Sequence, residues 1–479
     1  MFNGRIPFIK IERWHLFVFI FSLLILTHQI LWNPLHGDGA FYALILRDMN
    51  FDLTSPLFRA SGHPYFDHPY FFFYFGYPFI KIFGYSDWAI KLPNIFVGFF
   101  TLILILLISK KTNQNHVSGF FALIVLMLSP GYEHQLRMPS LDPLAHFLAI
   151  SSLYLLLRSN LERGRDFLIA GLILGFSFLT KGLEILPHLG AMLLIILFVN
   201  NVSLYQKIRL DRFFLILKFL FGLFIIVLIW YIIDTAYQIG WFQGYYQYQF
   251  SNRFFKNQNF ETSLFSLIFL KKLIVITQPW LLIALYFNIR FYIKNKFLPL
   301  LWKYLWIYLV LLTIAFSLIK KDSIQHFTGL FILIAIVVGQ GLYYEWSSFS
   351  EKKQIILKKL GQYFLFFLVV SALGLSTYFW IKPYDKKDLW SAVKNQKAPL
   401  DLKSTKILLL NPESPWQEQM YWTGRWYWSN PIIWVGIDQR PSVQIGQTII
   451  LATANAEGTS IELKEITVEN ELFNQINKK

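Results

Sequence analysis

A chain of 479 residues is long enough for about three soluble domains, but its composition excludes that reading. Hydrophobic residues make up 55% of the chain and charged residues only 15%, whereas a soluble chain typically carries about 25% charged residues. With 19% aromatic residues and a mean hydropathy of +0.45, it is not a disordered chain, a collagen, a coiled coil or an ordinary cytosolic enzyme. The composition predicts an all-α, polytopic membrane protein.

The formal net charge of +16 would suggest nucleic-acid binding in a soluble protein. In a membrane protein Lys and Arg collect in cytoplasmic loops, and we therefore expect no nucleic-acid partner. The absence of Cys excludes disulfides, thiolate metal sites and a Cys nucleophile. The first apolar run follows Lys10, Glu12 and Arg13, which indicates a retained helix and no cleavable signal peptide.

About 20 apolar residues cross the hydrocarbon of a bilayer. Runs of this kind predict about eleven transmembrane helices, and at most thirteen. The predicted spans are 15–32, 88–109, 117–130, 142–157, 167–180, 183–200, 213–233, 273–290, 304–319, 326–345 and 361–381.

Basic residues recur in alternate loops, which predicts a cytoplasmic N-terminus. Loops 33–87 and 234–272 then face outward, and they hold many of the acidic, histidine and interfacial aromatic residues. A bare channel would not need two long loops of this kind.

The tail 382–479 differs from the transmembrane domain 1–381. Its β-branched runs are short and are bounded by Gly, Pro, Asn and Asp, which predicts a small strand-rich domain, β-rich or α/β, outside the membrane. The runs are 406–410, 431–437, 447–452 and 461–468.

Two acidic motifs lie in the first outward loop. Asp38 directly follows the first span, where a carboxylate suits a general base or, equally, the cap of a helix beginning at Ala40. Asp67 and His68 precede Pro69 and an aromatic run that predicts an interfacial helix. Helix capping is again the alternative.

Two further polar clusters lie at the outward ends of spans. Arg137, close to Glu133 and His134, would pair with Asp142 or bind a ligand. Lys181 would either extend to the interface or bind an anion. No acid except Glu184 is its obvious neighbour in the sequence, so we expect a lipid phosphate to neutralise it. His188 follows in the same segment.

Polar and aromatic residues also gather in the later outward segments. Together with the earlier clusters they offer cations for a phosphate, carboxylates for a proton, and aromatics for a sugar or lipid. These later residues are Tyr245, Tyr246, Tyr248, Arg253, Lys256, Trp280, Lys320, Lys321, Asp322 and His326.

The order of these motifs resembles the superfamily of protein O-mannosyltransferases and aminoarabinose transferases, which have the GT-C fold and take a sugar from a polyprenyl phosphate. The similarity covers roughly residues 10–345. Its main motifs are Gly37–Ala43 with Arg47–Met49, Phe66–Tyr70 with Phe83-Gly84 and Lys91–Pro93, Arg137 to Asp142–Leu144, and Leu179–Gly182; Arg253-Phe254, Pro279-Trp280 and His326-Phe327 match more weakly.

Three positions depart from the family pattern. Gly39 stands where a Glu is common, Phe41 where a basic residue is common, and His68 where the family has Lys. The acid of the first motif is present as Asp38. The departures therefore affect the cations that would bind phosphate, and not the base.

The resemblance implies a glycosyltransferase in a bacterial-type inner membrane with an extracytoplasmic active face. The acceptor would be a hydroxyl or phosphate on a protein, lipid A or a glycan. Asp38 would act as general base in a single displacement with inversion. The resemblance also implies that the donor phosphate is bound by Lys181, Arg137, Arg253, His326 and His68. Asp67 and Asp142 would support these residues, and Asp67 and His68 would bind a divalent metal if one is used. Substrate or lipid contacts are implied for Tyr42, Tyr65, Tyr248 and Trp280.

Two other functions share some of these features. A polymerase or ligase of lipid-linked glycans would use the same kind of donor and differ in product size. A transporter or lipid flippase would also have many spans and a positive charge. Transporters, however, often show inverted repeats and broken helices at mid-membrane, and the polar motifs here cluster in outward loops.

Overall fold

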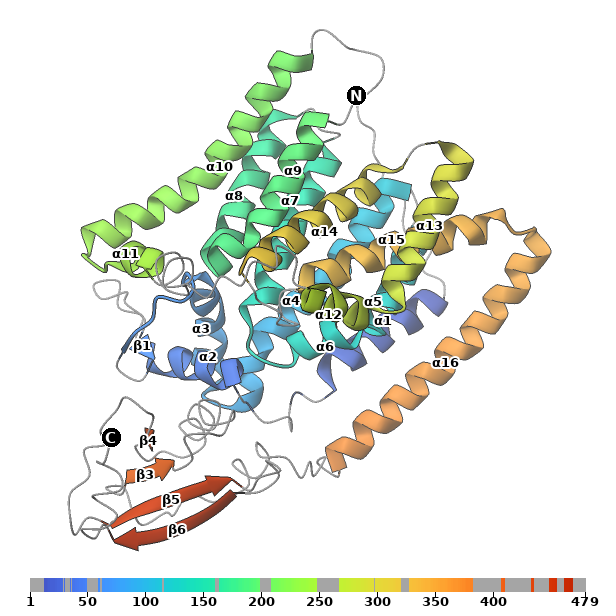
Figure 1. The fold of residues 1–479 in the computed structure, drawn as a ribbon. Coiled ribbons are helices and arrows are strands. Elements are labelled where there is room, and N and C mark those ends of the chain that lie inside the picture. The colour runs from blue at the N-terminus through green and yellow to red at the C-terminus, as the bar shows by residue number, and fades with distance from the viewer. Residues whose placement is uncertain are drawn as a thin grey trace.

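The computed structural model describes most of the transmembrane part and four strands of the tail (Figure 1). Tyr248, Arg253, Lys256 and His326 lie outside the described residues. The described ranges are 13–28, 30, 35, 37–49, 59–60, 63–113, 116–159, 163–198, 208–247, 267–296, 298–319, 327–381, 406–409, 432–434, 448–454 and 461–467.

The described part up to residue 381 is built almost wholly of helices. In its first half they are α1 (Arg13–Thr27), α2 (Gly37–Asp48), α3 (Phe71–Phe83), α4 (Asp87–Asn113), α5 (Val117–Met127), α6 (Pro130–Leu136), α7 (Leu141–Arg158), α8 (Gly164–Lys181), the 3₁₀ turn η1 (Gly182–Ile185) and α9 (Leu186–Phe198). The second half comprises α10 (Ile208–Ala236), α11 (Trp241–Tyr246), α12 (Leu267–Thr277), α13 (Trp280–Asn295), α14 (Leu300–Ile319), α15 (Thr328–Ser348) and α16 (Glu351–Ile381).

Among the described residues, five helical segments are long and apolar enough to cross a membrane. Each coincides with one or two of the predicted spans, which confirms an integral membrane protein. The total of about eleven spans stays a prediction. The five segments are Asp87–Thr112, Leu141–Arg158, Gly164–Leu197, Arg212–Ala236 and Thr328–Ser348.

Helix α15 forms the centre of the bundle. All of its residues from Thr328 to Gly341 are buried, because the helix is apolar around its whole circumference and must be covered on every side. On one side it packs so closely against α5 that a Cβ on Gly339 would lie 2.5 Å from the Ser118 carbonyl oxygen.

Helices α7 to α10 form a second packed group. Ser152 of α7 donates a hydrogen bond to the Ala170 carbonyl of α8 (2.8 Å), and Ser177 of α8 donates one to the Ala145 carbonyl (2.6 Å). These bonds make α7 and α8 antiparallel. Helix α10 approaches α8 closely at Gly171, where a Cβ would meet the Phe219 carbonyl oxygen at 2.0 Å. Small residues allow such close contact between membrane helices.

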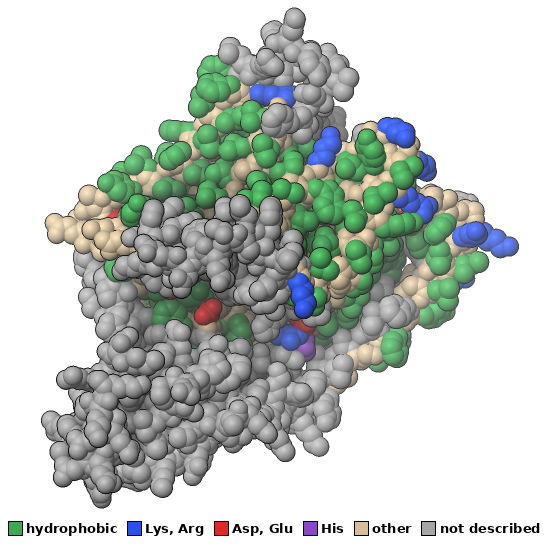
Figure 2. Space-filling model, in the orientation of Figure 1, with side chains coloured by type: hydrophobic (Ala, Val, Ile, Leu, Met, Phe, Trp, Pro, Cys, Tyr) green, Lys and Arg blue, Asp and Glu red, His purple; other side chains and the backbone are tan. Residues whose placement is uncertain are grey.

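The outer surfaces of these helices remain apolar. Helix α10 carries many exposed large side chains, among them Phe213, Phe221 and Phe224, as expected for a face in contact with lipid. Figure 2 shows hydrophobic side chains over the helices, with Lys and Arg side chains gathered near the ends of α13 and α15 and the start of α16.

The described strands form two small sheets. Strands β1 (Arg59–Ala60) and β2 (His63–Pro64) pair within loop 33–87. In the tail, β3 (Lys406–Leu409), β4 (Ile432–Trp434), β5 (Thr448–Ala454) and β6 (Ile461–Thr467) form a sheet in the order β4-β3-β5-β6. In this four-stranded sheet β3 pairs in parallel with β4 and with β5, and β5 pairs antiparallel with β6. Because much of 382–479 lies outside the described residues, the separate strand-rich domain stays a prediction.

Candidate active site

Asp38 lies in the first turn of α2. The predicted helix beginning at Ala40 is therefore wrong at its start, and Asp38 is a helical residue and not the residue that precedes the helix. A negative charge is favourable there because the first N–H groups of a helix have no internal partner. The side chain is exposed, and no described residue forms a hydrogen bond or ion pair with its carboxylate. Asp38 is thus open to a substrate.

The start of α2 contacts the segment that leads into α7. A Cβ on Gly39 would lie 3.3 Å from both Met138 Sδ and Pro139 Cδ. The same segment is held from α4, where the Asn94 amide donates hydrogen bonds to the Met138 carbonyl (2.5 Å) and the Gln135 carbonyl (3.4 Å). Three motifs distant in sequence therefore meet here.

Tyr42, one turn after Asp38 on α2, lies where the acidic motifs converge. It is only 8% exposed. Burial, and then nearby negative charges, hold its pKa well above the ordinary value, so the hydroxyl stays protonated and can donate a hydrogen bond. The carboxylates that act on it come from separate parts of the chain: Asp38, Asp142, Asp67 and Glu184.

The second acidic motif lies beside α2. The ring of Tyr65 packs against Phe41 (centroids 5.5 Å apart) and lies near His68 (6.5 Å). Tyr70 donates a hydrogen bond to the Tyr65 carbonyl (2.8 Å), which fixes the turn containing Asp67. The N-cap of α3 is Tyr70, with no side-chain cap, so helix capping by Asp67 or His68 is wrong.

Lys181 is only 2% exposed and is neutralised by protein carboxylates. Its ammonium group contacts Asp142 and forms a 2.9 Å ion pair with Glu184. The expectation that Lys181 has no acidic neighbour except Glu184 is therefore wrong, because folding brings α7 against the end of α8. The charge of this Lys does not require a lipid phosphate.

The turn after Lys181 is held by α11, which lies in loop 234–272. Gly182 has a φ of +66°, a conformation that Gly adopts without the strain of a side chain. The Leu183 N–H donates a hydrogen bond to the Tyr245 hydroxyl on α11 (3.0 Å). Asp234 in turn accepts hydrogen bonds from the Trp241 and Phe242 N–H groups that begin α11. The Lys181 turn is thereby linked to loop 234–272.

A buried chain of polar side chains runs from Asp142 into the bundle. His146 lies one turn further along α7, with Nε2 3.9 Å from the Asp142 carboxylate. Its Nδ1 is hydrogen-bonded to His188 Nε2 (3.0 Å), and His188 Nδ1 to the Tyr304 hydroxyl (2.7 Å). His146 therefore lies beside the same Asp142 oxygen, Oδ1, that the Lys181 ammonium contacts.

Arg137 pairs with Glu133 one turn before it, and not with Asp142 as predicted. Its guanidinium also donates a hydrogen bond to His28 Nε2 (3.0 Å), whose Nδ1 lies 2.8 Å from the Ile25 carbonyl. His28 Nδ1 also lies 3.2 Å from the Glu133 carboxylate, so His28, Arg137 and Glu133 form one cluster.

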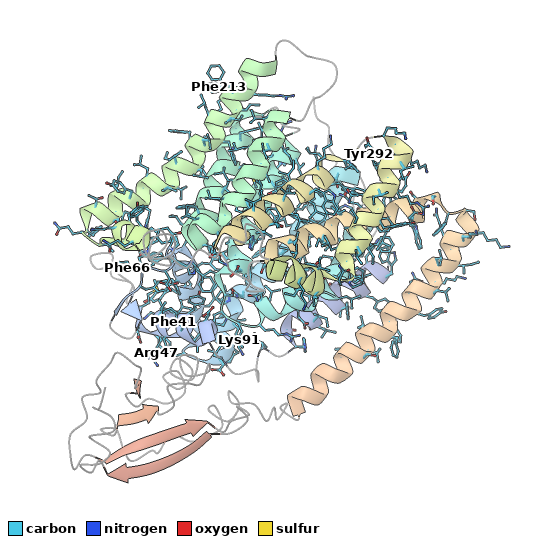
Figure 3. All side chains as sticks on the ribbon, in the orientation of Figure 1. Phe41, Arg47, Phe66, Lys91, Phe213 and Tyr292 are labelled. Carbon is cyan, nitrogen blue, oxygen red and sulfur yellow. The ribbon has the colours of Figure 1, made fainter. Side chains whose placement is uncertain are left out.

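Trp280, another predicted site residue, lies apart from the residues around Asp38 and Tyr42. The Trp280 indole N–H lies 3.5 Å from the Leu128 carbonyl at the end of α5, which places Trp280 near α5. Figure 3 shows Phe41 and Arg47 of α2 and Lys91 of α4 at one end of the helical part, with Phe66 on the same side and Tyr292 of α13 at the other end.

The metal prediction rests on Asp67 and His68. Within the described part of the chain, no three His, Asp or Glu side chains come together as a metal site would require. Two adjacent residues alone make a weak ligand set, so no catalytic step is derived through a metal here.

Three residues of this region were not predicted: His28, Asn94 and His146. Asn94 and His146 are polar residues inside predicted apolar spans, a pattern that marks function or structure in membrane proteins. That signal was present in the sequence. His28 carries the same signal, since it lies inside the predicted span 15–32. Only its partner could not be predicted, because Arg137 is 109 positions away.

Comparisons with known proteins concern the fold of the chain. The family model described as dolichyl-phosphate-mannose-protein mannosyltransferase matches residues 67–233. The crystal structure of ArnT from Cupriavidus metallidurans bound to undecaprenyl phosphate is similar over 92% of this chain and 93% of that chain, with a TM-score of 0.64 at 15% identity. The apo structure of the same protein gives a TM-score of 0.57 at 15% identity, over 93% of each chain. No curated protein matches at the level of sequence.

The fold and the family match define the class of the molecule, a membrane protein with the GT-C glycosyltransferase fold. More particularly, the chain resembles the polyprenyl-phosphate-sugar-dependent transferases of the protein O-mannosyltransferase and aminoarabinose transferase superfamily, as predicted from its motifs.

Proposed function

We propose that this protein transfers a sugar from a polyprenyl-phosphate donor to an acceptor hydroxyl on the extracytoplasmic side of a bacterial-type inner membrane. The family match and the ArnT-like fold support the reaction class. The similar ArnT structure holds undecaprenyl phosphate, which supports a lipid-linked donor for this chain. The alternating basic loops support an outward-facing site.

In the proposed reaction the Asp38 carboxylate accepts the proton of the acceptor hydroxyl. The hydroxyl oxygen forms a bond to the anomeric carbon as the bond from that carbon to the phosphate oxygen breaks. The polyprenyl phosphate leaves with its negative charge. One base and one displacement give inversion at the anomeric carbon, because a retaining route would need a second carboxylate as nucleophile.

The cations that bind the leaving phosphate should be ones that protein carboxylates do not already neutralise. Lys181 already serves two carboxylates and Arg137 one. We therefore assign phosphate binding to His68, beside α2, together with Arg253 and His326 of the later outward segments. Lys181 becomes a positioning residue, which holds Asp142 and Glu184 near Tyr42.

One observation carries the proposal. Of the carboxylates around Tyr42, Asp142 and Glu184 are tied to Lys181, whereas Asp38 is exposed and has no ion-pair partner in the described part of the chain. A general base needs a carboxylate that is accessible and not already neutralised by a cation. Asp38 meets both needs.

The test is a transfer assay with purified protein and a labelled sugar on polyprenyl phosphate. We expect the label to leave the lipid for a hydroxyl acceptor and the product to have the opposite anomeric configuration. A nucleotide-linked sugar should not replace the lipid donor. Movement of intact lipid across a vesicle without loss of the label, or a product of retained configuration, would overturn the proposal.

A further inference from the structure

A cavity of about 480 Å³ lies at the end of the bundle opposite to Asp38. It forms where the C-terminal ends of α4, α13 and α15 meet the start of α14. Its size falls in the range of about 300–1,000 Å³ that is usual for small-ligand sites. The lining residues used below are Lys111, Phe291, Trp302, Gln340, Tyr343 and Ser347.

The floor of this cavity is a buried polar network. The Trp302 indole donates a hydrogen bond to Gln340 Oε1 (2.5 Å), which fixes the orientation of the amide. Gln340 Nε2 then donates one hydrogen to Thr112 Oγ1 (2.7 Å). An amide nitrogen carries two hydrogens, and no described residue accepts the second. Gln340 is 4% exposed and lines the cavity, so this second N–H can donate to a molecule bound there.

The rim of the cavity is cationic. Lys111 lines it directly, and the Lys294 ammonium lies 5.0 Å above the ring of Tyr344, another lining residue. The one acid next to that ring in the chain, Glu345, is neutralised by a 2.9 Å ion pair with Arg290. The local charge therefore favours an anion. In Figure 2 Lys and Arg side chains gather near the ends of these helices.

The walls are apolar and aromatic. Leu157, Phe291 and Leu301 face the cavity together with Tyr343 and Tyr344. Trp and Tyr are enriched where a membrane meets water, and basic pockets between helices on the cytoplasmic side bind anionic lipid headgroups. Cations, a buried hydrogen-bond donor and apolar walls at a membrane edge match the headgroup and first acyl carbons of one lipid.

We propose that this cavity binds the phosphodiester headgroup of an anionic glycerophospholipid in the leaflet opposite to the active site. Lys111 pairs with the phosphate, the second N–H of Gln340 donates to a phosphate or ester oxygen, and the acyl chains leave along Phe291. The volume suits a headgroup with its glycerol. The site is separate from the residues of the proposed transfer reaction and does not depend on that reaction.

The test is native mass spectrometry of the full chain in detergent, titrated with phosphatidylglycerol or with phosphatidylcholine of the same chain length. We expect one phosphatidylglycerol to bind more tightly than phosphatidylcholine. Lys111→Gln should weaken phosphatidylglycerol binding roughly fivefold, as expected for one Lys at an anionic lipid. The matched control is Lys110→Gln, which removes the same charge from the same helix but does not line the cavity, and should leave binding unchanged.

A second variant keeps the charge and fills the space. Ser347→Trp places an indole in the cavity and should reduce retained phosphatidylglycerol while Lys111 remains. Equal losses in Lys110→Gln and Lys111→Gln would mean a diffuse basic surface and overturn the proposal. Equal retention of phosphatidylcholine, or full displacement of the lipid by inorganic phosphate, would overturn the assignment to an anionic phospholipid.

Discussion

Two acidic regions lie within reach of Tyr42, and they differ in burial and pairing. Asp142 and Glu184 share the buried cation of Lys181, whereas Asp38 is exposed on the first turn of α2. A buried ion pair is fixed because its loss leaves an unpaired charge in a poor solvent. An exposed carboxylate with no partner stabilises little and remains reactive. The difference assigns structure to the Lys181 region and chemistry to Asp38.

The largest expected effect comes from breaking the buried region. Lys181→Met leaves two carboxylates without their cation and should lower the free energy of unfolding by about 3–5 kcal/mol. The matched control is Arg47→Met, which breaks an exposed pair with Asp48 (3.1 Å) and should cost at most about 1 kcal/mol. Denaturant unfolding in mild detergent measures both. Equal losses would show that the Lys181 cluster is not a structural ion pair.

A smaller effect is expected from the residue between the two regions. Tyr42→Phe removes a protonated hydroxyl but keeps the ring, and should lower the transfer rate about three- to tenfold, as for one lost hydrogen bond. Stability should change little. Tyr74→Phe on α3 is the control, since that hydroxyl lies outside the acidic cluster. An unchanged rate in Tyr42→Phe would remove Tyr42 from the site and weaken the link between the two regions.

The smallest effect concerns the Arg137 contact with His28. His28→Ala removes the ring nitrogen that lies 3.0 Å from the Arg137 guanidinium, and should lower the free energy of unfolding by about 0.5–1 kcal/mol, as for one hydrogen bond. Denaturant unfolding in mild detergent measures the loss. An unchanged free energy of unfolding in His28→Ala would show that this contact does not stabilise the fold.

Much of the helical fold could be predicted because apolar runs report burial in lipid directly. The predicted span 142–157 matches α7, and the break predicted at Lys181 matches the end of α8. The limits of α2 were harder, since Gly37 and Gly39 are poor helix formers, and the close packing of Gly39 against Met138 could not be read from the sequence.

The sequence predicted which residues belong to the candidate site, but not all of their ion-pair partners. Asp38, Asp67 and Asp142 were each marked by position at a membrane edge, and they do converge on Tyr42. The pairing of Lys181 with Asp142 depends on which helix faces lie together, and sequence spacing between separate helices carries no information on this. The pairing of Arg137 with Glu133 is different, because the two residues are one helical turn apart and that spacing was present in the sequence.

The most direct measurement of the central claim is the turnover rate of Asp38→Asn at saturating donor. Asn keeps the size of the side chain but cannot accept a proton, so the rate should fall by at least about 10²-fold. Donor affinity and unfolding free energy should stay near those of wild type, and Asp48→Asn at the other end of α2 should transfer normally. A near-normal rate in Asp38→Asn would contradict the account, because the exposed carboxylate would then not be the base.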